Sequence, residues 1–247
     1  SNIWMSMVAE RGRREGAMQQ EGSSNQDPRA VARKLAEQAL EAGNPLEWFD
    51  RLYGLAESGQ ASIPWADRVV NPNLIQLYNQ IKGRSFGAKA LIVGCGLGDD
   101  AEWFAAKGFG VTAFDISEIA IAECRRRFPR TSVHYLTENL FEFPPEWENG
   151  FDLVIESYTL QVLPHTMRRD AIRNICRMLS PGGYLLFISR AREEAEPHGI
   201  MPWPLTLQEI RQFQDHGLQE IYFEDYYDPS EDSPVRRFRG CFNKDGT

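Results

Sequence analysis

Residues 89–117 constrain the fold of this chain more than any other stretch. An apolar run at 90–93 is followed by the glycine-rich sequence GCGLG at 94–98, and a helical pattern of apolar residues comes next. A second apolar run then ends at Asp115. A strand, a glycine turn, a helix and a second strand with an acid at its end form one βαβ half of a nucleotide-binding sheet. We therefore predict an α/β protein in which this stretch binds a nucleoside.

The glycines and the acid would contact different parts of such a ligand. Gly94, Gly96 and Gly98 lack the Cβ atoms that would keep a ligand away from the backbone. The helix that begins near Asp99 directs free N–H groups back toward the turn. Asp115 can accept hydrogen bonds from both hydroxyls of a ribose. The alternative is a tight strand–helix turn followed by a surface aspartate, without a ligand.

The spacing of the glycines distinguishes between cofactors. A dinucleotide site favours G-x-G-x-x-G, whereas this turn reads G-x-G-x-G and is followed by Asp99 and Asp100. Two carboxylates disfavour a pyrophosphate and favour a ligand with a cationic amino group or sulfonium. At these residues the sequence resembles the class I S-adenosylmethionine (SAM) methyltransferases. A NAD-binding enzyme is the less favoured alternative.

The resemblance covers roughly residues 85–190 and implies a cofactor site for SAM, with S-adenosylhomocysteine as the product. In the family, a polar side chain meets the adenine amino group and an apolar side chain lies against the ring. Asn139 and Leu140 match these positions, where the family often has Asp in place of Asn. A plain turn role is the alternative for Asn139. The implied cofactor-binding residues are Trp65, Gly94, Cys95, Gly96, Gly98, Asp115, Ile116, Asn139, Leu140 and Glu156.

The predicted fourth strand, residues 151–156, ends where an open α/β sheet places its ligands. Glu156 would neutralise the methionine amino group, take a proton from an acceptor, or cap the next turn. Tyr158 would face the reacting methyl group. Glu156 and Tyr158 are therefore the candidate catalytic residues, and Tyr158 is also a candidate substrate contact. Methyl transfer mainly requires positioning and desolvation, so no fixed triad is expected.

The segment ahead of this core resembles a second, narrower family. The motifs W-F-D-x-x-Y, P-W and N-P-x-L, between residues 48 and 74, resemble the leader of the thiopurine methyltransferase-like group. In that group the leader closes over SAM and shapes the acceptor pocket. Trp48 and Tyr53 are therefore candidate substrate contacts, and Trp65 would lie over the cationic sulfonium. For Trp48, packing of the leader onto the core is the alternative.

The chain divides into three predicted parts. Residues 1–26 are rich in Gly, Ser, Gln and charge and are predicted to form a flexible tail. Residues 27–84 would form a helical cap, and 85–247 the SAM-binding core. For the core we expect a three-layer, Rossmann-like, seven-stranded, mostly parallel sheet with an antiparallel last strand. Its final two strands, at 218–223 and 237–242, would be joined by an acidic, tyrosine-rich loop.

Two further segments of the core concern the site and its surroundings. A helix is predicted over residues 166–179, with Arg168 and the other arginines facing outward. Residues 190–205 have no regular period and contain three prolines. Because so long a loop in a compact domain is usually functional, we expect it to form a wall of the acceptor pocket. His198 and Trp203 are its candidate substrate contacts.

The composition excludes several classes of partner. The formal net charge of −8 disfavours a general nucleic-acid binder. No apolar run approaches the ~20 residues needed to cross a membrane, and residues 3–8 are too short a run for a signal peptide. The four cysteines are scattered, which indicates neither a metal site nor a disulfide framework and favours a cytoplasmic setting. The sequence leaves monomer and dimer open.

These observations predict a SAM-dependent methyltransferase of the EC 2.1.1 class that acts on a small molecule. The thiopurine-like leader implies a soft nucleophile as the acceptor, such as a thiol or a related anion. The alternatives are an O- or N-methyltransferase of another small molecule, a SAM-binding module without catalysis, and a methyltransferase for nucleic acid or protein. For the last, the sequence ESYT in place of N-P-P-Y after the fourth strand disfavours methylation of DNA amino groups, and the acidic balance also disfavours it.

Overall fold

The structure is a computed structural model that describes residues 28–62, 68–229 and 233–246. The predicted tail and Trp65 therefore lie outside the described residues. The α-helices are α1 (Pro28–Glu41), α2 (Trp48–Glu57), α3 (Pro72–Ile81), α4 (Asp99–Ala106), α5 (Glu118–Arg127), α6 (His165–Met178) and α7 (Leu207–Asp215). Within the described ranges there are also short 3-10 turns, namely η2 (Leu140–Glu142), η3 (Pro145–Trp147) and η4 (Leu160–Val162).

The described strands form one sheet in the order β3-β2-β1-β4-β5-β7-β6. β1 pairs in parallel with β2 and β4, and β7 runs antiparallel between β5 and β6. The prediction of a Rossmann-like, mostly parallel sheet with an antiparallel last strand is confirmed. The strands are β1 (Lys89–Val93), β2 (Gly110–Asp115), β3 (His134–Thr137), β4 (Phe151–Ser157), β5 (Leu179–Arg190), β6 (Leu218–Asp228) and β7 (Val235–Lys244).

The last two strands are longer than predicted, because the first half of the expected acidic loop belongs to β6. Acidic side chains of β6 lie opposite arginines of β7. Glu224 accepts a hydrogen bond from Arg239 (2.7 Å), and Asp225 accepts one from Arg236 (2.8 Å). Opposite charges on facing strands stabilise the pair. The sequence of β6 alone does not show that β7 supplies these arginines. Its acidic second half was therefore predicted to be a loop.

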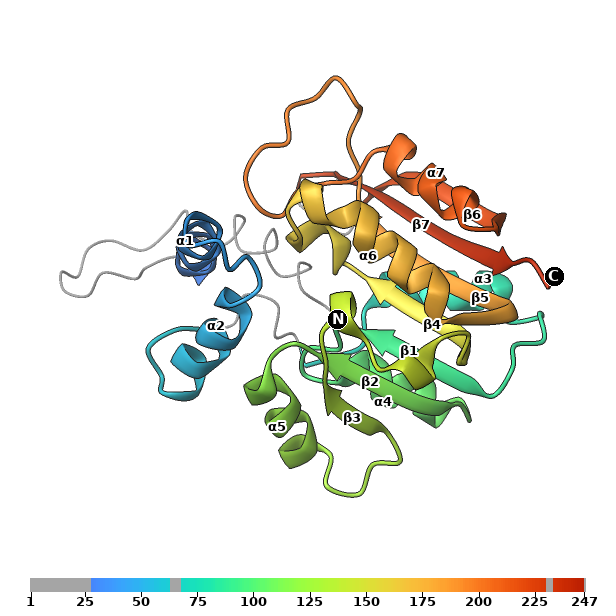
Figure 1. Ribbon diagram of the computed structural model, residues 1–247, viewed down its shortest axis with the longest axis horizontal. Coiled ribbons are helices and arrows are strands. Elements are labelled where there is room, and N and C mark those ends of the chain that lie inside the picture. Colours follow the sequence, from blue (N-terminus) through green and yellow to red (C-terminus); the bar gives the residue numbers. More distant parts are fainter. Residues whose placement is uncertain (1–27, 63–67, 230–232, 247) are drawn as a thin grey trace.

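The central strands alternate between two buried faces. On β1, Ala90 and Ile92 face one core, and Leu91 and Val93 face the other. Helices α3, α4 and α5 cover the first face, and α6 and α7 cover the second (Figure 1). Parallel strands that are buried on both faces are near-continuous apolar runs, which is why the sequence pattern located them well.

The helices α1 and α2 lie together beyond the edge at which the parallel strands end (Figure 1). They pack on each other, and α2 also packs on α5. Helix α3 was predicted as part of the same cap, but it packs against β5 and β7. Helices α1 and α2, which we call the cap helices, lie next to the carboxyl edge of the sheet. The amino end of α3 also contacts this edge, where the N–H of Asn71 donates to Asp100. The division of the chain at residues 84 and 85 stays a prediction.

The described residues contain neither a membrane-spanning helix nor a cluster of metal-ligating side chains. None of the helices there combines the length and the apolar character that a membrane span requires. The same part of the chain contains no group of three or more His, Cys, Asp or Glu side chains suited to a metal ion. All four cysteines are buried and unbridged.

The prediction that the arginines of α6 all face outward is wrong for Arg168, which faces inward. Its side chain is 1% exposed, whereas the neighbouring Arg169 is exposed. The guanidinium of Arg168 donates to the carbonyl oxygens of Leu160 and Trp203 and pairs with Glu209 at 2.8 Å. These contacts join η4, the 190–205 loop and α7. The periodicity of α6 could not reveal them, because every partner lies on another element.

Substitution of Arg168 tests this inner role. In Arg168→Ala the buried carbonyl groups and Glu209 lose their donor, so we expect the free energy of unfolding to fall by about 3 kcal/mol. Arg169→Ala is the matched control, with an expected change below about 0.5 kcal/mol because the side chain is exposed. Urea denaturation of both variants measures the difference. Equal stabilities would mean that the Arg168 contacts are energetically unimportant.

Candidate functional site

A cavity lies at the carboxyl ends of β1, β2 and β4. This position is where open α/β sheets bind ligands. The walls come from the core, from α2 and from the turn before α2. The lining residues are Leu46, Phe49, Tyr53, Val93, Gly94, Phe114, Asp115, Ile116, Glu138, Asn139, Leu140, Phe141, Thr159, Val162 and Leu163.

The glycine turn leaves β1 with left-handed backbone angles that side chains rarely adopt. Gly94 has φ of +60°, and a Cβ there would lie 2.5 Å from Oγ1 of Thr159. Gly98 has φ of +92°, and a Cβ there would lie 2.5 Å from the hydroxyl of Tyr135. Gly94 thus borders the cavity, while Gly98 permits packing behind the turn. The predicted glycines lie together in one turn, but Gly94 faces the cavity and Gly98 faces the packed side of the turn.

Asp115 stands beside the turn because β2 pairs with β1 in register. Its Oδ2 accepts the backbone N–H of Gly96 and its Oδ1 accepts that of Ser117, both at 3.0 Å. Burial raises the pKa of the Asp115 carboxyl, and the two N–H donors oppose this shift. Ile116 lines the cavity next to it. The carboxylate is therefore held in place from two sides, at the wall of the cavity.

Asn139 and Leu140 also line the cavity, after the end of β3. Oδ1 of Asn139 accepts the N–H of Phe141 at 2.9 Å, which caps the short turn η2. The turn role that was the alternative for Asn139 is therefore present in the structure, and the residue nevertheless borders the cavity. Its contact with an adenine stays a prediction.

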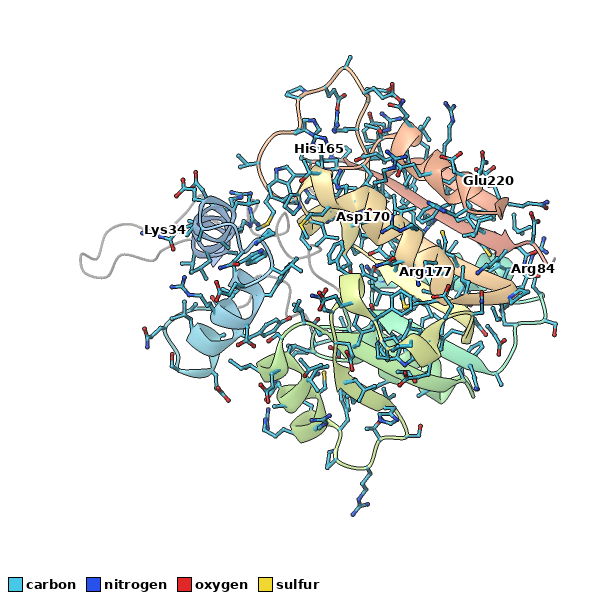
Figure 2. All side chains as sticks on the ribbon, viewed as in Figure 1. Lys34, Arg84, His165, Asp170, Arg177 and Glu220 are labelled. Carbon is cyan, nitrogen blue, oxygen red and sulfur yellow. The ribbon has the colours of Figure 1, made fainter. Side chains whose placement is uncertain are left out.

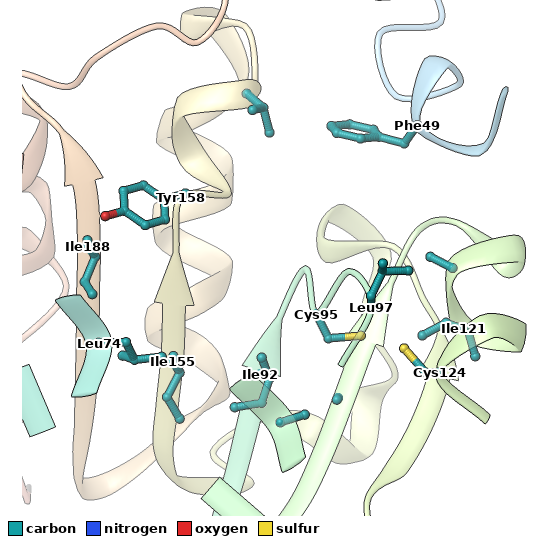
Figure 3. Packing of buried hydrophobic residues seen from close by; sticks show 14 of the residues in the cluster. Phe49, Leu74, Ile92, Cys95, Leu97, Ile121, Cys124, Ile155, Tyr158 and Ile188 are labelled. Carbon is teal, nitrogen blue, oxygen red and sulfur yellow. The ribbon is translucent and has the colours of Figure 1, made fainter. Parts of the chain in front are cut away.

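The cap contributes Leu46, Phe49 and Tyr53 to the cavity wall. Figure 3 shows the Phe49 ring extending from α2 toward the strand ends. Trp48 does not line the cavity: it is 1% exposed and stacks on Phe49, with 4.0 Å between ring centroids. Trp48 therefore has the buried, packed position that was the alternative to a substrate contact. A substrate-binding role for Trp48 stays a prediction.

Asp99 and Asp100 do not provide the open pair of charges that the sequence suggested. Asp99 pairs with Arg127 of α5, with both distances at 3.0 Å. Asp100 is buried, and its Oδ1 accepts the N–H of Asn71 at 3.0 Å. Both carboxylates contact the protein itself, so their role in selecting a cationic ligand stays a prediction. Both partners are distant in sequence, so the turn alone gave no sign of them.

Glu156 is completely buried at the end of β4. Its Oε1 accepts the N–H groups of Thr159 (2.6 Å) and Leu160 (3.2 Å), so the side chain caps the turn η4. Among the described residues, Oε2 has no hydrogen-bond partner. Burial raises the pKa of the Glu156 carboxyl to about 7. The capping alternative is present, and the side chain does not border the cavity; its catalytic role stays a prediction.

Tyr158 has φ of +60° and is also completely buried. Its ring lies 5.4 Å below the guanidinium of Arg237, and burial raises the pKa of its phenol. Figure 3 shows the ring turned toward Ile188 and away from Phe49. The residue is therefore directed away from the cavity in this arrangement. Strained backbone often marks functional sites, but a catalytic or substrate role for Tyr158 stays a prediction.

The remaining predicted residues lie near the site without lining the cavity. Cys95 is buried, its sulfur is directed toward Cys124 (Figure 3), and burial raises the pKa of its thiol well above the ordinary value. His198 is exposed and stacks on His165, which Figure 2 shows at the start of α6 near the 190–205 loop. Trp203 is half-buried, and its backbone N–H donates to the backbone carbonyl of Gln161.

Several lining residues were not predicted from the sequence, among them Glu138, Phe141, Val162 and Leu163. All four follow a parallel strand within a few residues of its carboxyl end. Because ligands lie beyond these ends, the positions after every parallel strand are the signal that predicts such residues.

The comparisons with known proteins agree with this geometry. Residues 90–183 match a family described as a methyltransferase domain. The chain is 33% identical over 117 residues to a malonyl-[acyl-carrier protein] O-methyltransferase of Enterobacter lignolyticus, covering 47% of this chain and 44% of that protein. It is 27% identical over 177 residues to a thiopurine S-methyltransferase of Vibrio cholerae, covering 65% and 79%. The match to the first relative thus spans less than half of its length.

A solved structure shows the same architecture. The N-methyltransferase NodS from Bradyrhizobium japonicum, in complex with S-adenosyl-L-homocysteine, aligns with a TM-score of 0.61 at 23% identity. The alignment covers 77% of this chain and 96% of that one. Residues 90–183 thus match a methyltransferase domain, and the sheet has the Rossmann-like architecture of this solved methyltransferase. SAM is the cofactor that such methyltransferase domains use. Within the class, the chain resembles the thiopurine S-methyltransferase group, as the leader predicted.

Asp115→Ala tests whether the carboxylate at the end of β2 binds the cofactor. The substitution removes the acceptor for two ribose hydroxyls, so we expect SAM affinity to fall about 100-fold, equivalent to about 3 kcal/mol. Asp115→Asn keeps one carbonyl acceptor and should lose less. Calorimetry measures both, with circular dichroism to check folding. An unchanged affinity in the alanine variant would remove Asp115 from the site.

The buried carboxyl of Glu156 predicts a pH dependence of stability. Its pKa is about 7 in the folded protein against an ordinary value of 4.5, so the folded state holds the proton more tightly. The stabilisation is complete below about pH 4.5 and is lost as the pH rises through 7. It amounts to at most about 3 kcal/mol.

Urea denaturation between pH 5 and pH 8 measures this effect, with Glu156→Gln as the matched variant. Glutamine is neutral at every pH and keeps the acceptor for Thr159 and Leu160. The difference in unfolding free energy between wild type and variant should therefore shift in favour of the variant as the pH rises. A difference that is constant across the range would contradict a raised pKa.

Proposed function

We propose that the chain is a SAM-dependent methyltransferase that acts on a small molecule, and that the preferred acceptor is a soft nucleophile such as a thiol. The observation that supports this most is the composition of the cavity wall. A glycine turn and an internally held carboxylate stand at one part of the wall, and apolar side chains form most of the rest. The 27% identity to a thiopurine S-methyltransferase supports the sulfur acceptor.

The cofactor fits the residues that line the cavity. Gly94 lines the cavity and would contact the ligand through its backbone. Asp115 would accept hydrogen bonds from the ribose hydroxyls, and Asn139 and Leu140 would lie at the adenine. When bound, SAM supplies an electrophilic methyl group on a good leaving group.

The walls of the cavity suit an acceptor that ionises by itself. Among the described lining residues, the ionisable side chains are Tyr53, Asp115 and Glu138, and none is a histidine, lysine or cysteine. With Asp115 at the ribose and Glu138 beside Asn139, no strong base is left for the acceptor. A thiol loses its proton more readily than a phenol or an alcohol, so it needs the least help. Phe49 and Leu46 would exclude water and desolvate the thiolate.

A second candidate function is O- or N-methylation of another small molecule. The 33% identity to a malonyl-[acyl-carrier protein] O-methyltransferase favours it. Such an acceptor would need a base, and Glu156 is the carboxyl with a suitable pKa, about 7. Glu156 is buried beside the cavity wall at Thr159, so it would have to act after a local rearrangement.

Three acceptors of matched shape distinguish these functions. Thiophenol, phenol and aniline share a ring and differ in the nucleophilic atom, and S-adenosylhomocysteine release measures turnover of each. We expect kcat/KM for thiophenol to exceed the other two at least ~10-fold, because the thiol is the most ionised and the softest.

The control in each assay is Asp115→Ala, which should be inactive with every acceptor. Faster turnover of phenol or aniline would replace the thiol proposal by O- or N-methylation. SAM binding without turnover, extended to a wider panel of thiols, alcohols and amines, would favour a binding module without catalysis.

A further inference from the structure

Asp50 connects the cap to the core at the cofactor cavity. It lies on α2, and its Oδ1 accepts hydrogen bonds from the Ser117 hydroxyl (2.8 Å) and from the N–H of Ile119 (3.4 Å). Ser117 is the N-cap residue of α5, and its own oxygen accepts the N–H of Ala120 at 3.1 Å. The carboxylate of the cap therefore meets the amino end of a core helix, where negative charge is favoured.

Ser117 extends this contact to the carboxylate at the cavity. Its backbone N–H donates to Oδ1 of Asp115, and Oδ2 of Asp115 accepts from Gly96, both at 3.0 Å. Ser117 is completely buried. One continuous series of hydrogen bonds thus joins Asp50, Ser117, Asp115 and the glycine turn. Asp50 itself is absent from the lining of this cavity, and its hydrogen-bonded connection to Asp115 passes through Ser117. It does line an adjacent cavity, which shares Ile116 and Asn139 with the first.

The position of α2 also determines one wall of the cavity. Phe49 and Tyr53, on either side of Asp50 in the sequence, both line it. Gly54 allows α2 to approach α5 closely, since a Cβ there would lie 3.3 Å from Cδ1 of Ile119. Asp50 and Gly54 are four residues apart, which places them on the same side of the helix. That side is the one that contacts α5.

We propose that Asp50 is a positioning residue for the cofactor site. It holds the cap helix α2 on the amino end of α5, so that Phe49 and Tyr53 close the cavity while Ser117 keeps Asp115 oriented. Without this acceptor, the Ser117 hydroxyl and the Ile119 N–H lose their partner, and α2 separates more easily from α5. This inference rests on the proposed function, because it concerns the affinity for SAM.

Two substitutions at Asp50 separate hydrogen bonding from helix packing. Asp50→Ala removes both contacts, and we expect the dissociation constant for SAM to rise at least ~10-fold by calorimetry, the loss of about one charged hydrogen bond. Asp50→Asn keeps the acceptor oxygen, and its affinity should stay within about 3-fold of the wild type. Glu57→Ala is the control, because Glu57 is an exposed acid on the same helix.

Hydrogen–deuterium exchange on the free protein gives a second readout that does not depend on the cofactor. Asp50→Ala should increase exchange in a peptide that contains the amides of Ile119 and Ala120, and in α2, whereas Asp50→Asn and Glu57→Ala should not. If the wild type binds SAM and Asp50→Ala binds it equally well, the positioning role is wrong. If the wild type fails to bind SAM, the proposed function falls, and unchanged exchange in Asp50→Ala would separately overturn the contact between α2 and α5.

A variant at Gly54 tests the same contact if Asp50→Ala does not fold. Gly54→Leu keeps the Asp50 carboxylate but places a side chain against Ile119, which should push α2 away from α5. We expect weaker SAM binding together with faster exchange in α2. Tight SAM binding by Gly54→Leu, with exchange as in the wild type, would contradict the proposal. It would mean that the packing of α2 on α5 does not affect the site.

Discussion

The site depends on the hydrogen bonds that the carboxylate of Asp115 accepts from the backbone. It accepts N–H groups from the glycine turn and from the start of α5, and so joins the ends of β1 and β2. The same ends are held together by the N–H of Cys95, which donates to the carbonyl of Phe114 at 2.9 Å. Because a carboxylate has several acceptor positions, these internal bonds leave it able to accept further donors from a ligand. The cavity wall is thus fixed before a ligand arrives, which lowers the ordering cost of binding.

The cap contributes to the cavity wall through side chains, and it is attached to the core through a separate contact. Its contribution to the cavity wall is made of apolar and aromatic side chains, and its contact with α5 depends on Asp50. Arg168 performs a comparable task on the other side of the sheet, where it holds the 190–205 loop through the carbonyl of Trp203. Two segments far apart in sequence are therefore each tied to the core by one charged side chain. Arg33 of α1 connects them directly, since its Nε donates to the carbonyl of Met201 at 3.0 Å.

Local patterns predicted the parts of this protein that local chemistry determines. The β1–turn–α4–β2 unit, the sheet and the position of Asp115 followed from apolar runs, glycines and one acid. The features that the sequence did not predict have a common cause, because each depends on a partner distant in sequence. Arg168 is buried by Glu209 and by loop carbonyls, Asp99 is paired with Arg127, and β6 continues because arginines of β7 face it. The role of Asp50 was invisible for the same reason, since Ser117 is 67 residues away.

Calorimetric titration of the unaltered chain with SAM, S-adenosylhomocysteine and NAD tests the central claim most directly. The glycine turn, Asp115 and the apolar wall predict that the two adenosyl ligands bind and that NAD does not. Binding of NAD alone would contradict the account, because it would mean that the turn recognises a pyrophosphate and that the methyl-transfer function is misassigned.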